Sequence, residues 1–362
     1  MHHRYLDHSW QKRVRAYAGP GVLESYDAGE LNDRSFAARI GDVANELKSD
    51  QPMKTFRFGV NVGPSRSRAE WAEKARKLED LGYATLTVPD HLTDFFAPMP
   101  ALISAAEATK GLRIGTNVLN NDFRHPVLVA REAATVDLLT EGRLQLGLGA
   151  GYVQSEYEQA GLDFDTGGIR VERLAEAVTL IKGLLKGEQV TLAGRHYRVT
   201  GHTIYPLPVQ QPHPPILIGG NGRNLLTLAA READIVGFSG ITFRRGGVVP
   251  DISGWRVSEV DKRMQLVRDV AGDRHPQLEL NALVQRVVVT DHPRQAAEEL
   301  ASRWTQLSPE EILKSPFVLI GTVDKQIEDL RARRERWGIS YYVIFEPYVD
   351  AFAPVVARLA GG

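Results

Sequence analysis

Short apolar runs alternate with longer amphipathic segments along most of the chain. Eight runs have the length of buried strands, at 56–61, 83–88, 112–118, 143–148, 216–218, 234–237, 278–289 and 341–345. Between them, apolar residues recur at helical spacing over 69–81, 127–139, 170–186, 225–231, 255–271, 295–304 and 324–337. Strands that alternate with helices indicate a parallel α/β sheet, and eight such units predict a closed (β/α)8 TIM barrel.

Residues 1–52 do not share this rhythm. Apolar side chains between Leu31 and Leu47 recur every three to five positions, the spacing of one face of an amphipathic helix. We therefore expect an N-terminal extension over 1–52, partly helical or disordered, and a barrel domain over 53–362. The extension either packs loosely or provides a helix that covers a partner or one end of the barrel.

Three segments interrupt the repeat, at 152–169, 190–213 and 239–254. The second has the pattern of a hairpin over 190–199 followed by a proline-rich return. Active-site loops of such barrels follow the carboxyl ends of the strands, so we expect these insertions to shape a substrate pocket.

Composition excludes several classes of function. The formal net charge is −1, which gives no general attraction for nucleic acid or anionic lipid. The chain has no cysteine, so disulfides, thiolate metal sites and cysteine nucleophiles are excluded. No apolar run reaches the roughly 18 residues of a membrane span, and the first residues lack the apolar core of a secretory signal. We expect a cytoplasmic protein that binds no nucleic acid, membrane or metal.

The second predicted strand ends in Val88-Pro89-Asp90-His91. At the carboxyl end of a barrel strand, this sequence would place a carboxylate and an imidazole in the site. Histidine titrates near neutral pH and can donate or accept a proton beside a hydride transfer. The alternative is that His91 only caps the following helix.

The third predicted strand ends in a run rich in amides. Asn117, Asn120 and Asn121 offer both donors and acceptors, as the edge of a pyrimidinedione ring requires. Asparagine also favours ordinary turns, which is the alternative.

The fourth predicted strand continues into a glycine-rich run, 147–151, that ends at Tyr152. The dinucleotide fingerprint G-x-G-x-x-G would need glycine at position 152. The glycines instead favour a close approach of the backbone to a flat ring.

A second glycine-rich run, 219–224, follows the fifth strand and leads into a helix. Such a turn leaves free N–H groups at the positive end of the helix dipole, and Arg223 adds a cation, so the run predicts a phosphate site. Short glycine-rich turns without a ligand are also common. The chain has no G-x-x-x-x-G-K-[ST], H-E-x-x-H or G-x-S-x-G motif, which disfavours nucleotide triphosphate hydrolysis, metal chemistry and serine hydrolysis.

Taken in order, these segments resemble the bacterial luciferase-like monooxygenase superfamily, in its branch that uses the deazaflavin coenzyme F420. The resemblance covers about residues 56–360. It rests on FRFGVNV, LTVPDHL, IGTNVLNNDFRHP, EGRLQLGLGAGYVQSEYEQAG, QPHPPILIGGNGRNLLTLAAREADIVG, FVLIGTVDKQIEDL and GISYYVIF.

The resemblance implies a role for each segment. His91 would transfer a proton beside the reactive ring, and a bulge after the third strand, often with a non-proline cis peptide, would fall at Asn117-Val118. The cofactor contacts that it implies are Asp90, Asn117, Val118, Asn120, Gly151 and Ser155, with the phosphate held by Gly219, Gly220, Asn221, Gly222, Arg223 and Asn224.

Two positions depart from the sugar-phosphate dehydrogenases of this family. Tyr152 stands where they have a glutamate that acts as an acid, and Ser155 where they have asparagine. A phenol can donate a proton, but its ordinary pKa of about 10 makes it a poor base near neutral pH. Tyr152 therefore argues against glucose-6-phosphate oxidation and favours reduction of an activated C=C, C=N or C=O bond, with His91 and Tyr152 as catalytic residues. We expect Glu156 either near the site or in ordinary surface contacts.

The resemblance thus implies an oxidoreductase that transfers hydride between coenzyme F420 and a small organic substrate, and that forms a homodimer. Two alternatives stay open: an FMN-dependent monooxygenase on the same barrel, and a deazaflavin-binding protein without turnover.

Overall fold

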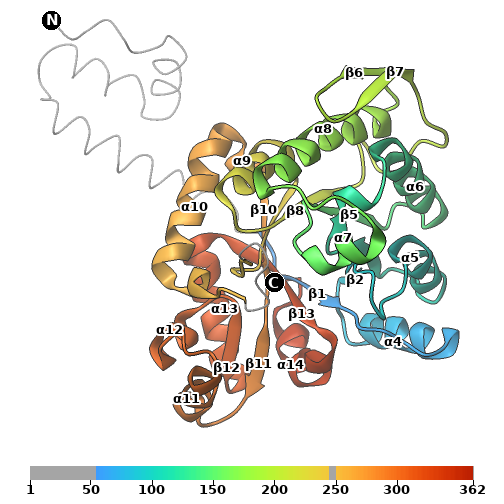
Figure 1. The fold of residues 1–362 in the computed structure, drawn as a ribbon. Coiled ribbons are helices and arrows are strands. Elements are labelled where there is room, and N and C mark those ends of the chain that lie inside the picture. Colours follow the sequence, from blue (N-terminus) through green and yellow to red (C-terminus); the bar gives the residue numbers. More distant parts are fainter. Residues whose placement is uncertain (1–53, 244–249, 362) are drawn as a thin grey trace, which may run out of the picture. The chain divides into compact units, whose positions relative to one another are not determined.

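Eight apolar runs form the strands of a closed parallel barrel in the computed structural model, which describes residues 54–243 and 250–361 (Figure 1). In their order around the barrel, the strands are β1 (Arg57–Asn61), β2 (Thr85–Val88), β3 (Arg113–Thr116), β5 (Leu144–Gly149), β8 (Ile216–Gly219), β9 (Ile235–Phe238), β10 (Glu279–Leu283) and β13 (Ile339–Phe345). β13 pairs with β1 and closes the ring. All residues of β2 and β5 are buried, because side chains fill the barrel on one face and helices cover the other.

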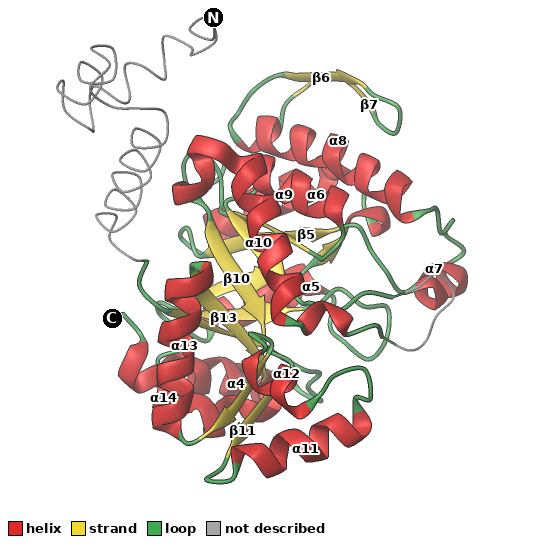
Figure 2. Ribbon diagram, turned by 90° about the vertical axis from the view of Figure 1, so that its left-hand side faces the viewer, coloured by secondary structure: helices red, strands yellow, loops and turns green. Residues whose placement is uncertain are grey.

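A helix follows each barrel strand along the chain and packs on the outside of the barrel (Figure 2). These helices are α4 (Arg68–Asp80), α5 (Pro98–Glu107), α6 (Pro126–Leu139), α8 (Gly167–Leu185), α9 (Arg223–Glu232), α10 (Val257–Ala271), α13 (Val323–Trp337) and α14 (Val349–Leu359). They turn apolar stripes inward; α13, for example, buries Ile327, Leu330 and Trp337. The predicted (β/α)8 barrel is confirmed.

The seventh predicted strand, 278–289, is wrong as a single element. Its first half is β10, and its second half is β11 (Arg286–Val289), which leaves the barrel and pairs with β12 (Val318–Gly321). The N–H of Val284 still donates to a carbonyl of β13, whereas the N–H of Gln285 donates to the carbonyl just before β12. Both halves are apolar, so the hydrophobic pattern alone does not show the break.

Helices α5 and α14 were not predicted, because prolines interrupt the helical pattern of both segments. Pro98 and Pro100 lie in the first turn of α5, where a missing N–H removes no helical hydrogen bond. Pro354 lies inside α14, whose buried face includes Phe352 and Leu359. Burial of that face outweighs the lost hydrogen bond.

Further elements lie outside the simple repeat. The first insertion contains α7 (Gln154–Ala160). The second contains the predicted hairpin, β6 (Val190–Ala193) with β7 (Arg198–His202), which lies beside α8 (Figure 2). The remaining elements are β4 (Leu119–Asn120), α11 (Pro293–Arg303) and α12 (Pro309–Lys314). The third insertion follows β9, and residues 244–249 within it lie outside the described residues.

The predicted N-terminal extension over 1–52, with its helix, also lies outside the described residues. None of the helices within the described residues carries an apolar stretch long enough for a membrane span.

The packing of α14 against β1 gives a test of the core. Phe352 is fully buried, and its ring meets that of Phe58 edge to face at 5.4 Å. We expect Phe352→Ala to lower the free energy of unfolding by about 3–5 kcal/mol, because it removes apolar contacts and leaves a cavity. Denaturant unfolding followed by circular dichroism measures this loss. Leu139→Ala, at a side chain that is 56% exposed, is the control and should change stability by about 0.5 kcal/mol or less. Equal losses in both variants would contradict the packing described.

Candidate active site

The residues singled out in the sequence follow four neighbouring strands at the carboxyl-terminal end of the barrel. Asp90 and His91 follow β2, residues 117–120 follow β3, residues 150–156 follow β5, and residues 220–224 follow β8. The carboxyl ends of parallel barrel strands lie on one face, where the active sites of such barrels are built. The contacts described next join three of these four segments directly.

The backbone departs from the strand after Thr116, as the resemblance implied. The peptide bond between Asn117 and Val118 is cis, so β3 ends two residues earlier than predicted. The side chain of Val118 packs against glycines of β5 and β8. A Cβ atom on Gly149 would lie 2.5 Å from Val118 Cγ2, and one on Gly219 would lie 3.3 Å from Val118 Cγ1. The two glycines therefore make room for Val118 between the strand ends.

Asp90 is buried and fully committed to protein contacts. Arg124 Nη1 and Nη2 donate to its two carboxylate oxygens at 2.5 and 3.0 Å. The backbone N–H of Asn120 donates to Oδ2 at 2.9 Å. A paired Arg–carboxylate fork of this kind fixes geometry as well as charge. Asp90 thus joins the end of β2 to the loop after β3, and this ties His91 to the segment that carries Asn117.

Asn120 and Tyr157 extend this network to α7. Tyr157 Oη donates to Asn120 Oδ1 at 2.9 Å and lies 3.1 Å from Asp122 Oδ2. Burial, with the Asp122 carboxylate adding to it, raises the pKa of the Tyr157 phenol well above its ordinary value. Asp122 is in turn paired with Arg173 Nη1 at 2.9 Å. The side-chain oxygen of Asn120 is thus used to hold α7 in place.

Gly151 has a structural reason to be glycine. Its φ is +72°, and a Cβ atom there would lie 2.0 Å from Tyr157 Oη. Arg170 supports the same turn, since its Nε donates to Ala150 O at 3.1 Å and its Nη2 to Gly151 O at 3.3 Å. Its guanidinium also stacks on Phe164 at 4.1 Å. The loop after β5 is therefore held from both sides.

His91 lies between two polar partners from the loop after β5. Its Nδ1 is 2.8 Å from Glu156 Oε1, and its Nε2 is 3.4 Å from Tyr152 Oη. The Glu156 side chain is only 7% exposed, against 25% for His91. Glu156 is thus a site residue, although the sequence left it between the site and the surface. Desolvation and the Glu156 carboxylate raise the pKa of the Tyr152 phenol, so Tyr152 stays protonated at neutral pH.

Aromatic and apolar side chains surround this pair at the surface. The rings of Tyr152 and Phe243 stack at 4.8 Å, and Phe95 lies 6.0 Å from the His91 ring. Leu92, the next residue after His91, is also exposed, whereas Phe96 packs edge to face on Trp71 of α4 at 5.4 Å. Exposed apolar side chains that gather around a polar group are typical of a binding surface for a partly apolar ligand.

The loop after β8 leads directly into α9, which begins two residues earlier than predicted, at Arg223. Gly222 precedes the helix and no side chain caps its first N–H groups. The side chain of Asn221 is not free for a ligand. Its Nδ2 donates to Ser239 Oγ at 3.0 Å, and its Oδ1 accepts from Gly240 N at 2.8 Å. Arg223 and the next residue, Asn224, are exposed, and among the described residues neither side chain has a hydrogen-bond or ion-pair partner.

Two predicted cofactor contacts differ in their surroundings. Asn117 Nδ2 is a buried donor that finds no hydrogen-bond partner among the described residues. An orphaned buried donor of this kind points to a missing acceptor. Ser155, by contrast, is exposed on α7, and no contact joins it to His91 or Asn117 within the described part of the chain.

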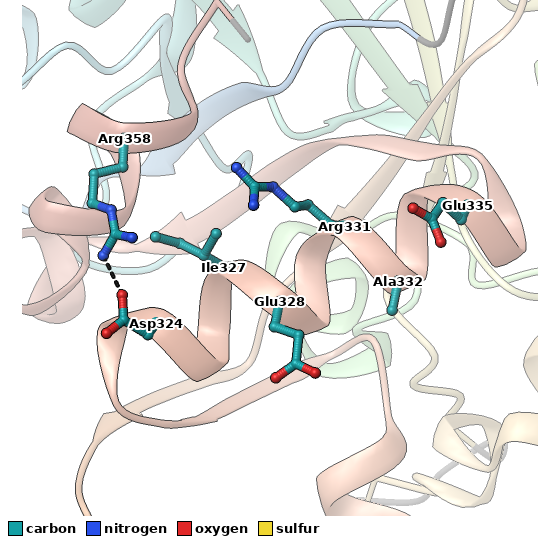
Figure 3. Close-up of a pocket in the computed structure, with 7 residues that line it drawn as sticks. All are labelled: Asp324, Ile327, Glu328, Arg331, Ala332, Glu335 and Arg358. Carbon is teal, nitrogen blue, oxygen red and sulfur yellow. Dashed lines mark hydrogen bonds and ion pairs between the residues drawn. The ribbon is translucent and has the colours of Figure 1, made fainter.

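A hollow of about 410 Å³ lies on the outer side of the barrel, away from the strand ends, between α13 and Arg358 of α14 (Figure 3). Its lining is mostly charged, and Arg358 pairs with Asp324 across it at 2.5 Å. None of the side chains around His91 contributes to it. We assign no ligand to this hollow.

Comparison with known proteins identifies the family of the chain. A family model described as luciferase-like monooxygenase matches residues 53–339. The chain is 31% identical over 262 residues to an F420-dependent glucose-6-phosphate dehydrogenase of Nakamurella multipartita, which is 70% of this chain and 73% of that relative. It is 36% identical over 147 residues to the oxygenase component of the flavin-dependent trigonelline monooxygenase of Acinetobacter baylyi, which is 39% of this chain and 40% of that one.

The matches differ in extent. The chain spans about half the length of several other F420-dependent glucose-6-phosphate dehydrogenases that it matches. Among solved structures, the coenzyme F420-dependent tetrahydromethanopterin reductase of Methanopyrus kandleri superposes with a TM-score of 0.67 at 16% identity, over 85% of this chain and 99% of that one. At this identity the likeness shows the fold alone.

The buried pair of Asp90 and Arg124 gives a test of the network. We expect Arg124→Ala to lower the free energy of unfolding by about 3–5 kcal/mol, because it leaves a buried carboxylate without its partner. In the double variant Asp90→Asn/Arg124→Ala, most of that loss should be recovered, since no charge is then left unpaired. Denaturant unfolding of the wild type, Asp90→Asn, Arg124→Ala and the double variant measures the coupling. Additive losses would show that the two side chains do not interact.

Proposed function

Because the chain belongs to the luciferase-like monooxygenase family, we propose that it is an oxidoreductase that transfers hydride between coenzyme F420 and a small organic substrate. The observation that carries this proposal is that an imidazole and an unsatisfied buried amide donor both follow neighbouring strands at the carboxyl-terminal end of the barrel. His91 supplies the first and Asn117 the second. We further propose a homodimer, as the resemblance implies, and a cytoplasmic location, as expected from the sequence.

The described residues fit a deazaflavin. Asn117 Nδ2 has no hydrogen-bond partner among the described residues, and we propose that it donates to an oxygen of the pyrimidinedione ring when the cofactor binds. The uncapped N-terminus of α9, with Arg223 and Asn224 exposed beside it, supports a site for the phosphate. When bound, coenzyme F420 supplies a hydride, and the protein contributes position and electrostatics. Asp90, Asn120, Gly151 and Asn221 shape the loops of this site through the contacts described above.

The residues around His91 favour reduction of an activated double bond or carbonyl. Tyr152 keeps its proton, and its raised pKa makes it a poor base, so it can donate a hydrogen bond to a substrate oxygen. The exposed aromatic side chains beside it suit a planar or partly apolar substrate better than a sugar phosphate. His91 would exchange the proton that accompanies hydride transfer.

Binding of the cofactor is the first test. We expect the purified full chain to bind oxidised coenzyme F420 with a micromolar Kd, and FMN much more weakly, in a titration followed by fluorescence quenching. Asn117→Ala should raise the Kd for coenzyme F420 about three- to tenfold, because a buried hydrogen bond is worth about 0.5–1.5 kcal/mol. Arg331→Ala, in the hollow on α13, is the control and should bind as the wild type does.

Two results of that titration would overturn the proposal. Tight binding of FMN without binding of coenzyme F420 would move the protein to the FMN-dependent monooxygenases, which the relative from Acinetobacter baylyi supports as the second candidate. Binding of neither would show that the loop after β8 is not a phosphate site.

Turnover separates an enzyme from a binding protein. With reduced coenzyme F420 and a panel of conjugated enones, imines and ketones, we expect oxidation of the cofactor by at least one class of acceptor. His91→Ala should lower kcat by about 10²–10⁴, the usual contribution of a general acid. Cofactor binding by His91→Ala is the control. If wild type and His91→Ala bind the cofactor equally and turn over equally, His91 has no catalytic role.

A further inference from the structure

Glu156 is buried beside His91 and has no part in the function proposed above. We infer that Glu156 is a positioning residue that holds His91 in the Nδ1–H form, and so makes Nε2 the single atom through which this imidazole exchanges protons. The inference rests on the proposed proton transfer by His91, but its central test does not depend on the cofactor.

The chemistry of the two side chains decides which atom donates the hydrogen bond between Glu156 and His91. Glu156 Oε1 lies 2.8 Å from His91 Nδ1. An ionised carboxylate can only accept hydrogen bonds, so the proton between the two atoms belongs to Nδ1. In a neutral imidazole, a proton on Nδ1 leaves a lone pair on Nε2. The hydrogen bond made by one ring nitrogen therefore decides the state of the other.

Glu156 is held in this position by its neighbour in α7. Tyr157 is fully buried, hydrogen-bonded to Asn120 and Asp122, and packed edge to face on Phe164 at 4.9 Å. Because these contacts fix the first turn of α7, they also fix the Cα atom of Glu156. The carboxylate is thus pre-placed and does not have to be drawn in by a ligand.

The other charges near His91 are paired with each other. Asp90 is bound to Arg124, and Asp122 is bound to Arg173. Among the described residues, Tyr152 is the other titratable group with a hydrogen-bond contact to the ring, and it lies on the Nε2 side. Glu156 is therefore the carboxylate that acts on Nδ1, and the neighbouring charges do not compete for that nitrogen.

The arrangement gives His91 the same geometry in both directions of the reaction. In reduction of a carbonyl, hydride from the reduced coenzyme would add to carbon, and an imidazolium would give its Nε2 proton to oxygen, which leaves a neutral His91 whose Nδ1–H still donates to Glu156. In oxidation of an alcohol, the Nε2 lone pair would take the hydroxyl proton while hydride passes from carbon to the oxidised coenzyme, and the imidazolium is restored. Glu156 accepts the same Nδ1–H hydrogen bond before and after each step, so no reorientation of the ring is needed.

The tautomer of His91 can be read directly in the full chain without any cofactor. We would label histidine with ¹⁵N, record long-range ¹H–¹⁵N correlations at a pH where His91 is neutral, and assign its signals with His91→Asn. We expect a pyrrole-type signal from Nδ1 and a pyridine-type signal from Nε2. In Glu156→Ala, the assignment should be reversed, with the pyrrole-type signal from Nε2 and the pyridine-type signal from Nδ1, because the free imidazole of histidine favours the Nε2–H form. Glu156→Gln should give a mixture, since an amide can accept from Nδ1–H or donate to Nδ1.

Glu158→Ala is the matched control. Glu158 lies in the same helix, is exposed, and accepts from Gln154 Nε2 at 2.7 Å, so its removal should leave the tautomer unchanged. Circular dichroism checks that each variant is folded, and Glu156→Gln tests the inference if Glu156→Ala does not fold. A wild-type His91 with its proton on Nε2, or an Nδ1–H form that persists in a folded Glu156→Ala or unmixed in Glu156→Gln, would overturn the inference.

Kinetics then link the tautomer to turnover. With coenzyme F420 as cofactor, Glu156→Gln should lower kcat about 10- to 100-fold relative to the wild type, with KM nearly unchanged, since the lost interaction acts in the transition state. If the wild type does not bind coenzyme F420, the proposed function is refuted, and the tautomer result still stands. Cofactor binding with an unchanged kcat in Glu156→Gln would refute the positioning role and leave the proposed function standing.

Discussion

The buried ion pair between Asp90 and Arg124 is the contact on which the geometry of the candidate site depends. It joins the end of β2 to the loop after β3, and the N–H of Asn120 adds a third hydrogen bond to the same carboxylate. A buried carboxylate is costly unless it is paired and hydrogen-bonded, so the loop is held where the pairing is complete. His91 is the next residue in the chain, and its position follows from this pair.

The same network determines which side chain contacts Nδ1 of His91. Asn120 links Asp90 to Tyr157, since its backbone N–H donates to Asp90 and its side-chain oxygen accepts from Tyr157. Tyr157 in turn holds α7 beside the strand ends. The short helix then brings Glu156 to Nδ1 from a position 65 residues further along the chain. Closure of the barrel places β2, β3 and β5 side by side, but closure alone does not set contacts of this precision. Those come from buried polar groups that have few ways to satisfy one another.

Much of this could be predicted from the sequence, and the reasons for the failures are physical. The alternation of strands and helices gave the barrel, because each element buries one stripe or one face. The break between β10 and β11 was missed because both strands are equally apolar, and α14 was missed because Pro354 lies inside it. The contact between Val118 and Gly149 could not be predicted, because nothing in the sequence around either residue indicates that the two pack together. Glu156 could not be assigned either, since a glutamate in an amphipathic segment has the same pattern whether it faces water or an imidazole.

The two partners of His91 differ in a way that gives the proton a direction. Glu156 is largely buried, and as a carboxylate it only accepts hydrogen bonds, so it holds the proton on Nδ1. Tyr152 is about half exposed and keeps its own proton, because desolvation and the nearby carboxylate oppose its ionisation. In the inferred tautomer, proton exchange therefore takes place at Nε2, on the side where Tyr152 and Phe243 form an aromatic surface. A substrate that covers this surface would displace water from Nε2 and take its place as the partner in proton exchange, so that binding and proton transfer depend on the same few side chains.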